Sequence, residues 1–196
     1  METNELDFLI VQSRDWDKEF GRIAKILFNN YSIRSNDKRF DIIEVEFYYD
    51  SKEHPDPFIY DKTERNKSRG NLFFHYSGVD ITFGDETNNI RGGILIRAIK
   101  DGDKYIIGPL KTMMALLNEC PRMDSGKEFH FNLEPKNLKD LSSIEPDQPT
   151  IRKGLDKTKR DKYEDEATSK YRFIKSREEI EEKSGLTPSQ FKQYYG

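Results

Sequence analysis

The stretch that decides the fold is Gly92-Gly93-Ile94-Leu95-Ile96-Arg97-Ala98-Ile99. From Ile94 to Ile99 the run is apolar on both faces, which predicts a central strand covered from both sides. Arg97 is the exception within this run. A guanidinium buried in such a strand needs a carboxylate partner, so the sequence should supply an acidic strand beside it.

The acidic strand is predicted at Phe40–Tyr49. Strict alternation predicts two faces, with Ile43, Val45 and Phe47 on one and Ile42, Glu44, Glu46 and Tyr48 on the other. If the two strands are neighbours, Arg97 meets Glu44 or Glu46, and the residues themselves do not choose between the two. The pair is either purely structural or a carboxylate held ionised by an arginine and able to activate a water.

Further elements are predicted around these two strands. An apolar stripe indicates a helix at Asp15–Asn29 with Ser13 as its N-cap. Pro109 indicates the start of a second helix, because its missing N–H costs nothing in the first turn. The buried side of this second helix is expected to consist of Leu110, Met113, Met114 and Leu117. The remaining predictions are strands at Asn71–His75, Gly78–Gly84, Tyr105–Ile107 and Tyr171–Ile174, and a last helix opening on the capping box Thr187–Gln190.

The outline is α+β, a single domain with a mixed or antiparallel sheet body and a few peripheral helices. Residues 1–175 are assigned to this domain and residues 176–196 to a C-terminal helical tail. Ser51–Gly70 and Glu134–Thr150 are predicted loops. The first of them is unusually long for a compact domain, and loops of that length are more often functional than idle.

Composition excludes several classes of protein. The 196 residues carry 33 Lys and Arg against 36 Asp and Glu, so no global basic excess attracts nucleic acid. The 13 Phe and 10 Tyr supply the large side chains of a core. A lone cysteine, Cys120, excludes an internal disulfide, and three histidines without matched carboxylates indicate no metal site. With no long apolar run and no basic N-terminal region, we expect a cytoplasmic protein away from the membrane.

Six segments follow one another in a recognisable order: Glu44–Tyr48, Thr63–Asn66, Ile94–Ala98, Gly108–Lys111, Ile151–Leu155 and Tyr171–Phe173. They resemble motifs of the alkyladenine (3-methyladenine) DNA glycosylase family. The family has Glu-Thr-Glu-Ala-Tyr, Thr-Pro-Arg-Asn, Leu-Leu-Arg-Ala, Gly-Pro-Ser/Gly-Lys, Pro-Arg-Val-Gly and Leu-Arg-Phe in the same order. The likeness covers about residues 15 to 175, nearly the whole predicted domain, and implies the fold of that family.

The resemblance implies a role for each matched residue. Glu46 takes the place of the water-activating base, and Arg97 that of the arginine that holds the nucleophilic water. Tyr48 takes the place of the ring that stacks on the flipped base. Nearest to the family's pocket histidine and asparagine lie His54 and Asp80, and an acidic group beside a base pocket departs from the family's pattern.

Two further roles belong to the contact with DNA. The residue that wedges into the duplex falls at Phe73 or Tyr76, and the sequence leaves both open. A local phosphate-binding rim is expected from basic residues in two segments, namely Arg65, Lys67, Arg69, Arg152 and Lys153.

The resemblance therefore implies a monofunctional DNA glycosylase that excises alkylated or deaminated purines. Such an enzyme acts as a monomer on double-stranded DNA, needs no metal or organic cofactor, and leaves an abasic site. The alternative is a non-catalytic relative that keeps the Arg–Glu pair for stability and binds a small ligand or a protein. Retention of Glu46, Tyr48 and Arg97 favours the enzyme, whereas the net acidic charge and Asp80 favour the binding module.

Overall fold

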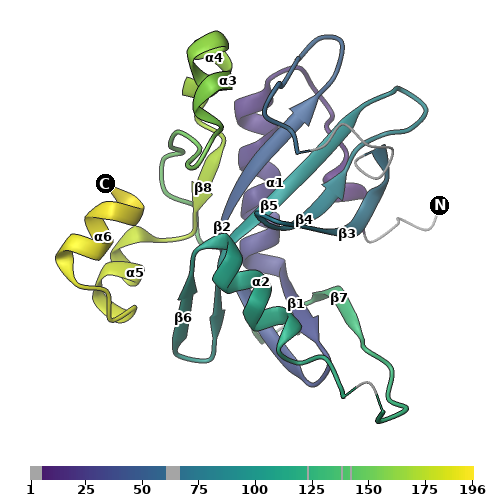
Figure 1. Ribbon diagram of the computed structural model, residues 1–196, viewed down its shortest axis with the longest axis vertical. Helices are drawn as coiled ribbons and strands as arrows, with labels where there is room; N and C mark the ends of the chain where they lie inside the picture. The colour runs from purple at the N-terminus through teal and green to yellow at the C-terminus, as the bar shows by residue number, and fades with distance from the viewer. Residues whose placement is uncertain (1–5, 61–66, 123, 138, 142) are drawn as a thin grey trace.

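The computed structural model describes residues 6–60, 67–122, 124–137, 139–141 and 143–196 (Figure 1). The strands in these ranges are β1 Tyr31–Ser35, β2 Lys38–Asp50, β3 Arg69–His75, β4 Gly78–Phe83, β5 Arg91–Asp101, β6 Lys104–Ile107, β7 Phe131–Pro135 and β8 Arg172–Ile174. The helices are a short 3-10 turn, η1 Asp7–Leu9, followed by α1 Trp16–Asn30, α2 Pro109–Leu117, α3 Lys157–Lys162, α4 Glu164–Thr168, α5 Arg177–Lys183 and α6 Pro188–Tyr195.

The strands form one curled antiparallel sheet (Figure 1). Its order is β3-β4-β5-β2-β1-β7, with β6 paired to β5 and β8 paired to β2. Strand β5 lies in the interior of the sheet, and β2 pairs with it from Asp41 to Asp50. The predictions of an α+β domain, of a central strand at Ile94–Ile99 and of an acidic strand beside it are therefore confirmed.

The pairing of β2 with β5 is irregular near its middle. The register shifts between Ile42 and Glu44 and again between Glu44 and Val45. The first shift leaves Ile43 without a partner on β5, and the second leaves Arg97 without a partner on β2. These are two compensating β-bulges, a feature that re-aims side chains and often lies beside a functional site.

The bulges correct the predicted faces of the acidic strand. Ile42 packs with Val45 and Phe47 in the main core, whereas Ile43 lies in a second cluster with Ala98 on the opposite side. The predicted placement of Ile42 and Ile43 is wrong, because strict alternation cannot register an inserted residue.

Helix α1 covers one face of the sheet and was correctly predicted as an amphipathic helix. Phe20 and its apolar neighbours one turn apart are fully buried against β2 and β4. The N-cap is Asp15, whose carboxylate accepts the Lys18 N–H at 3.3 Å. Ser13, the predicted cap, instead donates its hydroxyl to Glu19 at 3.4 Å.

Helix α2 begins where predicted but buries a different side. Thr112 and Leu116 are fully buried, whereas Leu110 and Met114 are 51% and 65% exposed. The prediction is wrong for Leu110 and Met114, whereas Met113 packs against the main core and Leu117 is half-buried. Nearly every position of this helix is apolar, so spacing cannot mark one face. The Thr112 hydroxyl fixes the orientation by donating to the Arg97 carbonyl at 3.3 Å, next to the bulge of β5.

The shorter elements divide into predicted and missed ones. The strands β3, β4, β6 and β8 and the capping box of α6 are confirmed. Strands β1 and β7 were missed, because their mutual pairing joins segments about a hundred positions apart in the sequence. In the last twenty-one residues, Ile180 of α5 and Tyr195 of α6 pack on the second cluster beside Ile43.

Figure 1 shows the layers that result. Helix α1 lies behind the sheet, α2 crosses in front of its lower part, and α5 and α6 lie together at the left edge. The face of β2 and β5 that α1 leaves free is covered by α6 and by the segment around Arg152. Within the described ranges no helix is long and apolar enough to cross a membrane.

Candidate functional site

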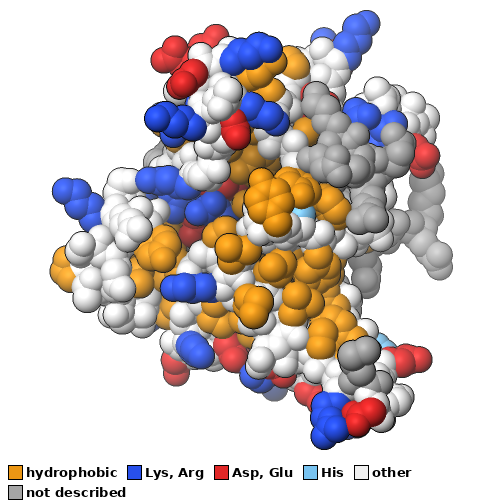
Figure 2. Space-filling view, in the orientation of Figure 1, with side chains coloured by type: hydrophobic (Ala, Val, Ile, Leu, Met, Phe, Trp, Pro, Cys, Tyr) orange, Lys and Arg blue, Asp and Glu red, His pale blue; other side chains and the backbone are white. Residues whose placement is uncertain are grey.

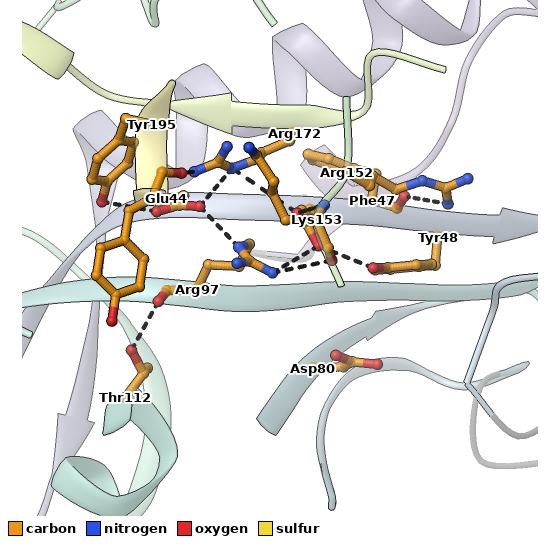
Figure 3. Close-up of polar contacts among 12 residues, drawn as sticks. Glu44, Phe47, Tyr48, Asp80, Arg97, Thr112, Arg152, Lys153, Arg172 and Tyr195 are labelled. Atoms are coloured by element: carbon orange, nitrogen blue, oxygen red, sulfur yellow. Dashed lines mark hydrogen bonds and ion pairs between the residues drawn. The ribbon is translucent and has the colours of Figure 1, made fainter. Parts of the chain in front are cut away.

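A cluster of four charged side chains lies on the face of β2 and β5 that points away from α1 (Figure 3). Glu44 and Glu46 come from β2, Arg97 from β5 and Arg172 from β8. The most exposed of the four side chains, that of Arg97, is 12% accessible. Two carboxylates and two guanidiniums balance in charge, which is the condition under which such groups can be buried together.

Glu44 is the hub of this cluster. One of its carboxylate oxygens accepts hydrogen bonds from the Arg97 Nε at 2.9 Å and from the Arg172 Nε at 2.7 Å. The other oxygen accepts the hydroxyl of Tyr195 at 3.0 Å. Arg172 in turn donates to the carbonyl of Tyr194 at 2.7 Å, so the cluster ties α6 to the sheet.

Glu46 lies one pleat further along β2 and is fully buried. Its Oε2 accepts from Arg97 Nη1 at 3.2 Å and from the Tyr48 hydroxyl at 3.0 Å. Its Oε1 accepts the backbone N–H of Lys153 at 2.7 Å. The Lys153 carbonyl lies 3.5 Å from the same Arg97 nitrogen. The predicted approach of Arg97 to Glu46 is confirmed, and Arg97 pairs with Glu44 as well.

Burial sets the acid–base character of this cluster. It raises the pKa of Glu46 above its ordinary value, although Arg97 and the Lys153 N–H oppose the shift. For Arg97, burial alone would lower the pKa, but the carboxylates of Glu46 and Glu44 outweigh it and raise the pKa. Burial and the neighbouring Glu46 carboxylate also raise the pKa of the Tyr48 phenol, which therefore stays protonated as a donor. Glu46 is thus a more basic carboxylate than one in water, which suits proton abstraction.

A cavity of about 340 Å³ opens directly beside the cluster. Its walls are largely aromatic and consist of Tyr48, Phe58, Tyr60, His75 and Tyr76. Leu95, Arg97 and Asp80 line it from the sheet, and Lys153 to Asp156 with Lys159 line it from the opposite side. The volume and the mixture of apolar walls with a few polar groups are typical of small-molecule and cofactor sites. Glu46 does not line the cavity itself, but it accepts hydrogen bonds from two residues that do, Tyr48 and Arg97.

Arg152 supports the ring of Tyr48 from behind. Its guanidinium lies 4.7 Å from the centre of that ring and pairs with Asp56, the two side chains being 1% exposed. It also donates to the carbonyls of Phe47 and Glu166 at 3.2 and 2.8 Å. A guanidinium so buried cannot reach a phosphate, so Arg152 is a supporting residue of the pocket wall and not part of a phosphate-binding rim.

The two predicted pocket residues lie in different places. His54 lies outside the cavity, because its ring is held between the Tyr49 carbonyl and the Tyr171 hydroxyl, each at 2.8 Å, and packs on α1 through Trp16. The predicted pocket role of His54 therefore does not fit its position. Asp80 does line the cavity, where it accepts a hydrogen bond from His75 at 3.1 Å.

The two candidate wedge residues also separate. Phe73 is 7% exposed and does not line the cavity; its ring packs against the rings of Tyr60 and His75, so it cannot enter a duplex. Tyr76 is 78% exposed at the turn between β3 and β4, on the rim of the same cavity.

Of the other predicted phosphate contacts, Arg65 lies outside the described residues. Lys67 and Arg69 are half-buried at the start of β3 and do not line the cavity. Lys153 lines the cavity and directs its ammonium group to the carbonyl of Gly196 at 3.0 Å.

Arg172 and Tyr195 are members of the cluster that the sequence analysis missed. Like Arg97, Arg172 is a guanidinium within an apolar run, Tyr171–Ile174, and therefore needs a carboxylate partner. For Tyr195 no local signal exists, because its partner Glu44 lies 151 positions away in the sequence.

Two other kinds of site fit the structure less well. Among the described residues, no three His, Cys, Asp or Glu side chains gather as a metal ion would require. A larger open hollow of about 1020 Å³ is lined by residues of the paired strands β1 and β7 and of the segment before β7, among them Arg34, Glu119 and His130. It shares no residue with the charged cluster or the aromatic cavity, and charged or polar side chains line most of it, so the aromatic cavity is the better candidate.

Comparison with known proteins gives little functional information. No family model matches the chain. The chain is similar to "Uncharacterized protein L759" of Acanthamoeba polyphaga mimivirus, with 29% identity in an alignment over 125 residues that covers 51% of this chain and 57% of the viral protein. The alignment thus spans little more than half of that protein, whose name states no activity.

Proposed function

We propose that this protein is a divergent DNA glycosylase that removes a damaged purine from double-stranded DNA, as its motifs imply. The observation that carries the proposal is the junction of Glu46 and Arg97 with an aromatic cavity through Tyr48. A flipped nucleotide needs a pocket that offers rings for stacking and a few polar groups for reading the base. A hydrolytic glycosylase needs, in addition, a carboxylate beside the sugar to take a proton from water.

The proposed reaction proceeds by attack of water on the sugar. The base stacks on Tyr48 after leaving the duplex, at a cost of a few kcal/mol. Glu46 accepts a proton from a water that is oriented by Arg97 and by the Lys153 carbonyl. The water oxygen then forms a bond to C1′ while the C1′–N bond breaks, and the electron pair of the C1′–N bond leaves with the base. The proton on Glu46 passes to an uncharged base as it departs, or to solvent where the base was a cation, and Glu46 is ionised again. The products are a free base and an abasic site.

One acceptor position on Glu46 is available for that water. A carboxylate oxygen accepts about two hydrogen bonds, and Oε2 already has Arg97 and Tyr48 as donors. Among the described residues, Oε1 has the Lys153 N–H as its donor within hydrogen-bond distance, because the Nε of Arg172 is 4.0 Å away. Glu46 is fully buried, so the segment at Lys153 that lines the cavity has to move to admit this water.

One side of the surface around the cavity is basic, which supports the proposed contact with DNA. Figure 2 shows Lys and Arg side chains gathered between α3 and α6, next to a hydrophobic surface on the same face. Lys159 lines the mouth, with Lys157 and Arg160 exposed beside it on α3. Tyr76 stands at the opposite rim as the proposed wedge. This local basic side would offset the overall net charge of −3 in binding phosphates. The same proposal includes that the protein is a monomer and that it acts in the cytoplasm.

A non-catalytic binding module is the second candidate, and one observation favours it. Glu46 is 0% exposed and each of its two oxygens already has a donor. In a binding module the cluster would serve only to hold β2, β5 and α6 together, and the aromatic cavity would bind a small planar ligand without chemistry.

The variant Glu46→Gln tests the two candidates against each other. If Glu46 is the base, single-turnover excision of hypoxanthine, ethenoadenine or 3-methyladenine should fall about 10²–10⁴-fold while binding of the damaged duplex persists. If the cluster is only structural, the wild type releases none of these bases and the variant loses about 3–5 kcal/mol of stability. Glu86→Gln, at an exposed position of the β4–β5 turn, is the matched control and should change neither quantity.

A further inference from the structure

Asp80 brings an ionisable group into the cavity that the proposed reaction does not use. It lies on β4 opposite Leu95 and its side chain is 4% exposed. Its Oδ1 accepts a hydrogen bond from His75 Nε2 at 3.1 Å. Its Oδ2 has no hydrogen-bond donor among the residues that the structure describes, and Asp80 lines the cavity. Oδ2 is not one of the fully buried side-chain atoms that lack a partner, so it is open to the cavity, where a ligand can donate a hydrogen bond to it.

His75 is fixed in a form that leaves Asp80 an acceptor. The Ser77 N–H donates to His75 Nδ1 at 3.2 Å, so Nδ1 is unprotonated and the proton of a neutral ring is on Nε2, facing Asp80. The ring of Tyr60 stacks on His75 with centres 4.2 Å apart and holds it in place. Asp80 is therefore held by a neutral donor on one oxygen and keeps its other oxygen for the ligand.

Gly93 makes room for this arrangement. It lies on β5 between Tyr48 of β2 and Thr82 of β4, on the side of the sheet that faces the cavity. A Cβ atom at Gly93 would lie 2.7 Å from Asp80 Oδ2, closer than such atoms approach. The missing side chain at Gly93 thus leaves space for the carboxylate of Asp80, which lines the cavity.

The chemistry of the bases then selects among damaged purines. A guanine-type edge presents two adjacent donors, N1–H and the 2-amino group, and can donate both to a carboxylate. An ethenoadenine edge has no N–H donor there, and hypoxanthine has only one. Alkylation at a ring nitrogen of guanine adds a positive charge, and hydrogen bonds between a charged donor and a carboxylate are the strong ones.

We infer that the pair of Asp80 and His75 makes the pocket selective for N-alkylated guanine. This inference rests on the proposed glycosylase function and names the substrate class that the same cavity takes. Asp80 Oδ2 accepts the donor edge of the base, and Tyr48 stacks on its face. Asp80 is a specificity-determining residue and takes no part in the attack of water.

The test compares two lesions in otherwise identical duplexes, 7-methylguanine and ethenoadenine. Wild-type protein is expected to excise 7-methylguanine faster in single turnovers. Asp80→Asn replaces one acceptor with a donor, so it should lower the ratio of the two rates about 10–100-fold, the scale of one bidentate base contact. Because both rates come from one preparation of each variant, the ratio does not depend on the fraction that is folded.

A second arm separates this inference from the proposed function. Equilibrium binding of the same duplexes to Glu46→Gln should keep the preference for 7-methylguanine, and Glu46→Gln/Asp80→Asn should lose it. If the wild type excises both lesions and Asp80→Asn leaves the ratio of rates unchanged, the function stands and the inference fails. If the wild type excises neither lesion but the binding preference depends on Asp80, the glycosylase proposal fails and the pocket's selectivity stands. Equal binding of both lesions by both variants overturns the inference.

Discussion

The charged cluster predicts that Glu44, and not only Glu46, is essential to the fold. Glu44→Gln keeps the shape of the side chain and most of its hydrogen bonds. An amide oxygen can still accept from the Nε atoms of Arg97 and Arg172, and the amide nitrogen can donate to the Tyr195 hydroxyl. What the substitution removes is one negative charge, so the cluster changes from neutral to a net charge of +1.

The expected cost follows from that imbalance. Arg97 and Arg172 have side chains 12% and 2% exposed, so water cannot solvate the uncompensated charge. Removing one partner of a buried ion pair costs about 3–5 kcal/mol. For a chain of this length, 1 kcal/mol corresponds to about 2–4 °C in Tm, so the melting temperature should fall by about 6–20 °C.

A double-mutant cycle, in which denaturant unfolding gives the stability of each variant, measures the interaction energy between Glu44 and Arg172. Arg172→Met removes one of the two guanidiniums, and Glu44→Gln/Arg172→Met returns the cluster to neutrality. The double variant should therefore be more stable than the sum of the single losses predicts, by about 1–3 kcal/mol. A loss below about 1 kcal/mol for Glu44→Gln, or simple additivity in the cycle, would refute the view that charge balance holds the cluster together.

Two further predictions concern α2 and the pH dependence of the reaction. Leu116→Ala, at a fully buried position, should cost about 2–5 kcal/mol in chemical denaturation, whereas Met114→Ala on the exposed side of the same helix should stay within about 0.5 kcal/mol. Excision requires ionised Glu46, whose raised pKa places the rising limb of the pH–rate profile above 4.5, and the profile of Glu46→Gln should lack that limb. The same shift makes Glu46 contribute stability that is fully present below pH 4.5 and lost as pH rises through its folded pKa, so the stability of wild type relative to Glu46→Gln should decrease over that interval.

The neighbourhood of β2 and β5 could be predicted because burial and charge leave few choices. Arg97 within an apolar strand requires an acid, and an alternating strand with Glu44 and Glu46 is the acidic strand that satisfies it. The sequence could not choose between the two glutamates, and the structure explains why. The bulge at Arg97 places its guanidinium between them, so that it bonds both.

The features that could not be predicted depend on contacts between distant residues rather than on the local sequence pattern. A bulge adds one residue without any change in composition, so the side taken by Ile43 is invisible to alternation. The buried side of α2 is decided by Thr112, a polar residue that bonds the carbonyl of the bulge. Arg152 has the composition of a surface cation, and only the fold brings Asp56 to it from 96 positions away.

The cluster divides two roles between its glutamates, and this division is what allows a catalytic group to exist in a buried ion pair. Glu44 bonds both guanidiniums and Tyr195, so it carries the charge balance that stabilises β2, β5 and α6. Glu46 shares Arg97 with it but otherwise bonds Tyr48 and the Lys153 backbone, both of which line the cavity. Because Glu44 remains beside both arginines, protonation of Glu46 during a turnover would leave neither guanidinium without a carboxylate. The two glutamine variants should therefore separate: Glu44→Gln lowers chiefly stability, and Glu46→Gln lowers chiefly the rate.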